Sequence, residues 1–302
     1  MLTDNVALAR IALRKASFAS RSEAGRYAAN QRWQGQGKVF DASTDDTNFS
    51  LLDWEKTKYE QAKTVRQTVK DRINREISAE DQADLLISLG RTPFGTREKM
   101  VEQIANGTYD DSLLTAFDNN YTGQGDFGGS PYSVTSIALQ EAVRRRFNPP
   151  NAKPATEKAN SDHLKLINNP TMQKVADIIV DEVYKDTQNY LAEKGVQSVV
   201  VYRGTKNDEL AALAGSKNVT VRLRPFASFA SERGVADMFA QKNDWAGRKA
   251  KGVILKATVD AKNIFAIGKR NFGMAPEAEL LVLGGDITLD VKKYKPSKRF
   301  PD

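Results

Sequence analysis

The spacing of apolar residues divides the chain into a helical part and a later part rich in short strands. Residues 5–34 and 50–88 carry apolar side chains at helical spacing between many charged ones. Residues 171–194, "TMQKVADIIVDEVYKDTQNYLAEK", predict a long amphipathic helix that Gly195 ends. The first two-thirds of the chain is therefore expected to be mainly helical.

Short apolar runs follow this helix and predict strands. Their length and their content of β-branched residues favour strands over helices. One helix is expected among them, at 232–241. The predicted strands are 198–204, 219–229, 251–259, 263–268, 278–285 and 287–294. This order predicts an α+β fold with a mostly antiparallel or mixed sheet.

A polar stretch separates the helical part of the chain from the strand-rich part. Residues 147–160, "FNPPNAKPATEKAN", are rich in Pro, Asn and Ala and poor in apolar side chains, which is typical of a boundary. We expect three segments: a basic helical segment at 1–45, a helical region at 46–150 and a domain at 151–302. The Gly-rich stretch 119–131 lacks the Gly-Lys-Ser/Thr ending of a nucleotide P-loop, so it predicts a surface loop.

The composition excludes several kinds of site. The 302-residue chain has no Cys, which rules out disulfides, thiol catalysis and Cys-based zinc sites. Its single His, His163, rules out a poly-His metal site, so no metal is expected. No apolar run reaches the roughly 18 residues of a membrane span, and the N-terminus lacks the apolar core of a signal peptide. These features predict a cytoplasmic protein that does not enter a membrane.

The charge is unevenly distributed. The net charge is +7, and residues 1–40 carry seven basic groups against two acidic ones. Residues 291–300, "VKKYKPSKRF", add five more basic groups. Basic ends favour a polyanionic partner such as nucleic acid, while the alternative is simple solvation of helix faces.

Residues 78–107 predict two short helices around an extended "LGRTPFGT", with Thr96 as the N-cap of the second. The segment loosely resembles the SAP-type DNA-binding helix–loop–helix module, with Gly95, Thr96, Arg97 and Lys99 at the start of its second helix. A helical hairpin without a special function is the alternative interpretation.

Three short motifs in the strand-rich part carry the candidate chemistry. They are "YRG" at 202–204, "FAS" at 226–228 and "EAE" at 277–279, each at the edge of a predicted strand. Singly, each motif fits a solvated strand end. Their order along the chain resembles the Arg–Ser–Glu class of mono-ADP-ribosyltransferases, the cholera- and iota-toxin-like group that includes bacterial toxins and phage enzymes. The resemblance covers about residues 198–294, with helix 171–194 before it.

This resemblance implies a core of two packed, mostly antiparallel sheets that binds NAD as a substrate. It implies that Arg203 binds the NAD diphosphate, which suits a permanently charged, bidentate guanidinium. Glu279 would stabilise the oxocarbenium-like ribose, and the Ser228 hydroxyl would orient that carboxylate. Gly204 and Phe226 flank these residues and are expected to help bind the cofactor.

In this family, Glu-x-Glu marks transfer to arginine. Glu277 would then hydrogen-bond the acceptor guanidinium and take its proton as the attack proceeds. The implied partner is a target protein with a reactive arginine, in a host cytoplasm if the chain is a phage or effector protein.

Two loops complete the expected site. Trp245 could stack on nicotinamide and Arg248 could contact phosphate, although a core Trp and a surface Arg are equally compatible with the sequence. Phe272 lies in a Gly-flanked loop before the two glutamates and is a candidate contact for the acceptor. The usual Ser-Thr-Ser of the second motif is replaced here by Ser228-Phe229-Ala230, so only its first Ser is retained.

The function expected from these residues is transfer of ADP-ribose from NAD to protein arginine. Two alternatives stay open. One is a phage structural or nucleic-acid-binding protein with a non-catalytic version of the fold, and the other is an NAD glycohydrolase that uses water as the acceptor.

Overall fold

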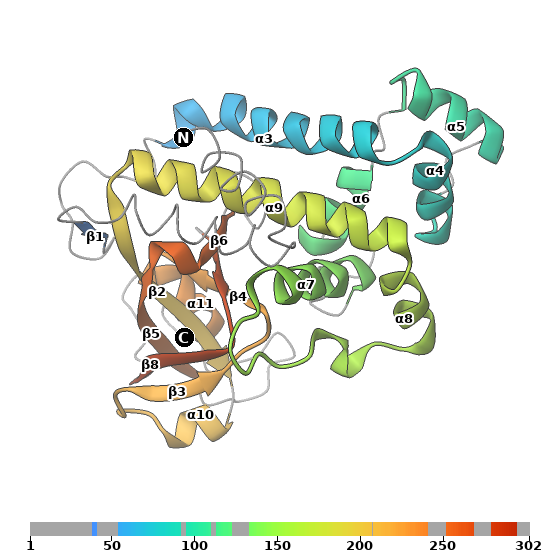
Figure 1. Cartoon of the computed structure of the whole chain (residues 1–302). Helices are drawn as coiled ribbons and strands as arrows, with labels where there is room; N and C mark the ends of the chain where they lie inside the picture. The colour runs from blue at the N-terminus through green and yellow to red at the C-terminus, as the bar shows by residue number, and fades with distance from the viewer. Residues whose placement is uncertain are drawn as a thin grey trace, which may run out of the picture.

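A computed structural model describes residues 38–40, 54–91, 95–109, 113–122, 133–206, 208–240, 252–268 and 279–294 of the chain. Helices of the first part lie along one side of a sheet made by the second part (Figure 1). This arrangement confirms the predicted α+β class with helices before strands. The predicted helix at 5–34 lies outside the described residues.

The helices of the first part begin at polar caps. Ser78 accepts a hydrogen bond from the Asp81 amide, and Thr96 accepts one from the Lys99 amide, which confirms the predicted cap. Asn169 caps the longest helix, which has Pro170 in its first turn. The described helices up to this point are α3 (Trp54–Glu76), α4 (Ala79–Ser88), α5 (Arg97–Ala105), α6 (Leu113–Thr122), α7 (Val134–Phe147), α8 (Ser161–Ile167) and α9 (Pro170–Glu193).

The strands of the second part agree closely with the predicted ones. They are β2 (Val196–Lys206), β3 (Val219–Arg222), β4 (Phe226–Ala230), β5 (Gly252–Asp260), β6 (Ile264–Ile267), β7 (Glu279–Leu283) and β8 (Asp286–Lys293). Short helices α10 (Asp208–Ala212) and α11 (Arg233–Ala240) lie between strands. An unpredicted strand, β1 (Lys38–Phe40), pairs in parallel with β2.

One prediction was wrong in detail, because residues 219–229 form two strands rather than one. The chain leaves the first at Arg222 and enters the second at Phe226, with Pro225 between them. Proline has no amide hydrogen to donate to a ladder, so a break there is expected. The Pro225 carbonyl instead accepts from the Gly284 amide, next to β7.

The strands are hydrogen-bonded in the order β3-β8-β5-β2-β4-β7-β6, and each neighbouring pair in this order is antiparallel. Two joins are incomplete among the described residues. Strands β2 and β4 are paired only at Tyr202 and Ala230. Strand β8 is shared, with residues 290–293 beside β5 and residues 286–289 beside β3. The sheet therefore opens at both places.

The core joins the two parts of the chain. One hydrophobic cluster contains Val175 and Ile179 of α9 together with Phe226, Phe265 and Leu281 of the sheet. A second cluster brings residues of β2 and β5 together with residues of β4, β7 and β8, so the sheet curves around a shared interior. The three-segment division of the chain stays a prediction, and residues on both sides of its expected boundary at 147–160 share the first cluster.

Ion pairs join α9 to two neighbouring helices. Asp181 accepts from Arg72 of α3 at 3.4 Å and also pairs with Arg146 of α7. Glu182 accepts from Arg72 at 2.9 Å. One acidic turn of α9 thus links α3 and α7. In the part of the chain that the structure describes, no helix is long and apolar enough to span a membrane.

Candidate functional site

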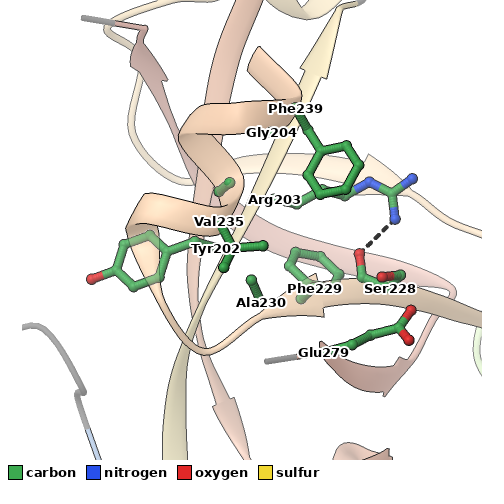
Figure 2. Close-up of a pocket in the computed structure, with 10 residues that line it drawn as sticks. Tyr202, Arg203, Gly204, Ser228, Phe229, Ala230, Val235, Phe239 and Glu279 are labelled. Carbon is green, nitrogen blue, oxygen red and sulfur yellow. Dashed lines mark hydrogen bonds between the residues drawn. The ribbon is translucent and has the colours of Figure 1, made fainter. Parts of the chain in front are cut away.

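The incomplete join between β2 and β4 forms one wall of a pocket of about 150 Å³ (Figure 2). Strands β2, β4 and β7 and helix α11 contribute to it. The described residues that line it are Tyr202, Arg203, Gly204, Ser228, Phe229, Ala230, Val235, Ala236, Phe239 and Glu279. All three residues of the YRG motif therefore lie in the same pocket as Ser228 of FAS and Glu279 of EAE.

Strand register explains how Ser228 and Glu279 meet. Ala230 is paired with Glu279, and Ser228 is paired with Leu281, two positions further along β7. Side chains two residues apart on a strand lie on the same face. Ser228 and Glu279 are therefore diagonal neighbours on one face of two adjacent strands.

Arg203 reaches this pair across the opening in the sheet. Its Nη1 donates to the main-chain carbonyl oxygen of Ser228 at 2.6 Å. Figure 2 shows the guanidinium of Arg203 and the carboxylate of Glu279 on either side of Ser228. A charge-assisted bond of this length fixes the guanidinium at the pocket and connects two strands that have little ladder pairing.

Helix α11 closes the pocket by packing unusually near the sheet. A Cβ atom at Gly204 would lie 1.8 Å from the carbonyl oxygen of Ala236, and one at Gly252 would lie 1.6 Å from that of Ala240. Only glycine permits such contact between helix and strand backbones. Gly204 is thus needed for packing, beyond its predicted place beside the cofactor.

The pocket combines a buried acid with a basic group. Glu279 is only 6% exposed, whereas Arg203 and Ser228 are half-buried. Charges interact more strongly in such a partly water-excluded place than in bulk water. The arrangement suits a ligand that is positive near Glu279 and negative near Arg203.

Phe239 is a pocket residue absent from the predicted site. It lies on α11 four positions after Val235, so both side chains face the pocket, and it is 48% exposed. The signal available in the sequence was the apolar pair at this spacing in a helix that directly follows the serine motif. A large exposed ring at a pocket edge offers a flat apolar surface to a planar ligand.

Phe226 does not line this pocket. It is 6% exposed, and its ring stacks on Phe265 with centroids 5.4 Å apart, in the core shared with α9. Its predicted cofactor-binding role stays a prediction, while its described contacts are those of a packing residue under β4. The physical reason is that Phe226 begins β4 beneath the helices, at the end of the strand away from Ala230.

Four other predicted residues, Trp245, Arg248, Phe272 and Glu277, lie outside the described residues. The basic segment at 1–37 does so too, and the nucleic-acid prediction for it stays open. In the SAP-like segment, Arg97 donates two hydrogen bonds to the Asp84 carboxylate of α4, at 2.6 and 2.9 Å. This ion pair joins the two helices of the segment, which fits the alternative interpretation as a helical hairpin. Within the described ranges, no cluster of three or more acidic or His side chains could hold a metal.

Comparison with known proteins gives no match: no family model fits the chain, and neither a curated protein nor a solved structure is significantly similar to it.

Proposed function

We propose that the chain transfers ADP-ribose from NAD to arginine side chains of a target protein. The observation that supports this most directly is the meeting of Arg203, Ser228 and Glu279 in one pocket, from three separate strands. These are the residue types that cleavage of NAD requires: a cation for the diphosphate and a carboxylate for the ribose.

The pocket's size suits one ring of the substrate. A cavity of about 150 Å³ can hold a benzene-sized molecule. The nicotinamide ring would enter here, against Phe239, with its ribose toward Glu279. The diphosphate would extend toward Arg203, whose guanidinium carries five N–H donors in a fixed fork.

The proposed reaction breaks the bond between ribose C1′ and the nicotinamide nitrogen. The bonding electron pair leaves with nicotinamide, which becomes neutral, and C1′ becomes electron-deficient. Glu279 stabilises this positive charge by electrostatic attraction and by a hydrogen bond from a ribose hydroxyl. A guanidine nitrogen of the acceptor then bonds to C1′, and Glu277 takes the proton that this nitrogen releases.

The experiment is incubation of the full chain with NAD labelled on its adenylate, in the presence of agmatine or an arginine-containing protein. Nicotinamide release together with label on the guanidino group is the expected result. Nicotinamide release without labelled acceptor would assign the chain to NAD glycohydrolysis. If no nicotinamide is released, the enzymatic proposal fails and a binding or structural role replaces it.

A further inference from the structure

A second cavity, far larger than the first, lies where the helical part meets the sheet. Its volume is about 560 Å³, within the range of small-molecule sites. Its walls are the end of β5, the start of β8, the linker after α7 and Tyr184 of α9. None of its lining residues belongs to the pocket of Arg203, so a ligand bound in this cavity would be independent of the proposed reaction.

The cavity arises because β8 changes partner. Residues 290–293 of β8 pair with β5, but residues 286–289 pair with β3 instead. The last residues of β5, Thr258 to Asp260, therefore separate from β8 and leave a fork between the strands. Strands that pass from one pairing partner to another commonly make such corners.

Hydrogen bonds fix both sides of the fork. On one side, the Tyr184 hydroxyl donates to the Lys262 carbonyl oxygen at 2.9 Å. On the other, the Asp286 amide donates to the Pro150 carbonyl oxygen at 3.0 Å, and Asn151 donates to the Asp286 carboxylate at 2.7 Å. Walls that are held in place before binding lower the entropic cost of taking up a ligand.

The lining combines aromatic rings with neutral polar groups. Phe147 and Tyr184 form one wall, with ring centroids 4.6 Å apart and planes tilted by 55°. Exposed hydroxyls of Thr258 and Thr288 and the side-chain amide of Asn263 lie on the strand side. Hydroxyls and amides both donate and accept hydrogen bonds, so they can match a ligand that does the same.

The charges disfavour an anionic ligand. Asp260 and Asp286 both line the cavity, and among its described lining residues Lys262 is the one basic group. Its ammonium is 3.4 Å from the Asp260 carboxylate, which offsets its charge. Arg222 does not line the cavity but lies 3.6 Å from the Asp286 carboxylate and offsets part of its charge. At the cavity surface a phosphate would still meet two carboxylates, whereas a hydroxyl group can donate to either of them.

From these features we propose that the cavity binds an uncharged, hydroxyl-bearing ring, that is, a sugar. The C–H face of the ring would pack on the aromatic wall, and its hydroxyls would bond to the carboxylates, Asn263 and the two threonines. A free saccharide and the ribose of a nucleoside share this chemistry, so the test includes both.

The test is isothermal titration and ligand-observed NMR of the full chain with glucose, maltose, adenosine and glucose 6-phosphate. At least one of the three uncharged ligands is expected to bind, and glucose 6-phosphate is expected to bind at least about tenfold more weakly than glucose. Binding of none of the uncharged ligands at up to about 20 mM would overturn the proposal. Equal or tighter binding of the phosphate would overturn it as well.

Matched threonine variants locate the binding. Thr288→Val should weaken binding about tenfold by removing one hydrogen bond. Thr220→Val is the control, because Thr220 is also exposed and is paired directly with Thr288 on β3 but does not line the cavity. Thr258→Val tests the other strand of the fork, β5. If both Thr288→Val and Thr258→Val leave the affinity unchanged, the ligand binds elsewhere and the assignment is wrong.

Discussion

Arg203 and Ser228 are joined through a main-chain atom, since Nη1 of Arg203 donates to the carbonyl oxygen of Ser228 at 2.6 Å. This contact connects β2 and β4 where the described strands share a single residue pair. It does not involve the Ser228 hydroxyl. The position of the guanidinium and the chemistry of the serine side chain can therefore be tested separately.

Ser228→Ala should preserve the fold and lower the rate of NAD cleavage about tenfold, because it removes the hydrogen bond that the hydroxyl is proposed to donate to Glu279 but keeps the carbonyl contact to Arg203. The rate of nicotinamide release and the thermal midpoint together measure this. A matched control is Ser88→Ala on α4, whose exposed hydroxyl bonds only locally to Asp84. Full activity in Ser228→Ala would remove the hydroxyl from the mechanism.

Glu279→Gln should reduce both nicotinamide release and arginine labelling by about 10²- to 10³-fold, since the amide keeps the volume but loses the charge that stabilises the ribose cation. The measurement is the single-turnover rate at saturating NAD. Glu209→Gln, at an exposed position of α10, serves as the control. An active Glu279→Gln enzyme would contradict the site assignment, whatever the behaviour of the control.

Glu277→Gln should separate transfer from hydrolysis. Transfer to agmatine is expected to fall about 10²- to 10⁴-fold with loss of a general base, while nicotinamide release with water as acceptor continues. Measuring both products in one reaction gives the ratio directly. Parallel loss of the two activities would instead place Glu277 with Glu279 in NAD cleavage, and unchanged transfer would remove its role.

Gly204→Ala and Gly252→Ala should each destabilise the protein by about 1–3 kcal/mol, because the added methyl group would displace α11 from the sheet. Activity should fall as well, since Ala236 and Phe239 of α11 line the pocket. The free energy of unfolding in urea is the measurement. Gly95→Ala is the control, because its Cβ would be 3.4 Å from the flexible Lys99 side chain.

The titration of Asp237 should lower the free energy of unfolding as pH rises. Burial raises the pKa of this carboxyl, and the charge of Arg233, 3.9 Å away, opposes the rise only in part. Its Oδ1 is buried without a hydrogen-bond partner in the described structure. As pH increases from the ordinary carboxyl range through the raised pKa, the unfolded chain loses this proton first, so the free energy of unfolding decreases.

Asp237→Asn removes this titration. Relative to the wild type, the variant should gain stability toward neutral pH and show little difference at acid pH, where the Asp237 carboxyl would be protonated in both the folded and the unfolded chain. Urea unfolding across that pH range tests the sign. A stability difference that is independent of pH would show that Asp237 does not titrate in this way.

Sequence patterns predicted the helices and strands well where the apolar spacing was regular. Helix α9 and strand β5 were each predicted within two residues of their bounds, because both have long, consistent apolar patterns. The pattern failed at Pro225, because the alternating apolar residues at 219–223 run into the apolar residues at 226–229 and hide a change of strand. It also gave no sign of β1, whose three residues are too few to show an alternation.

The candidate site was predictable only in part. Arg203, Ser228 and Glu279 could be proposed together because the order of their three motifs along the chain resembles that of a known enzyme class, although each motif alone fits a solvated strand end. The burial of Phe226 in the core was beyond prediction, because its nearness to Ser228 along the chain does not show which end of a strand lies beneath the helices. The Arg203 contact to a carbonyl oxygen was also beyond prediction, since every residue has that atom.

The strand order has a consequence for synthesis of the chain. Strand β2, made first among the long strands, lies centrally, whereas β7 and β8, made last, complete the two flanks. Glu279 enters the pocket only when β7 pairs with β4, after β2, β4 and α11 have all been made. A nascent or prematurely terminated chain would carry Arg203 and Ser228 without their acid. The proposed NAD-consuming activity would therefore stay absent until β7 has been made and has paired with β4.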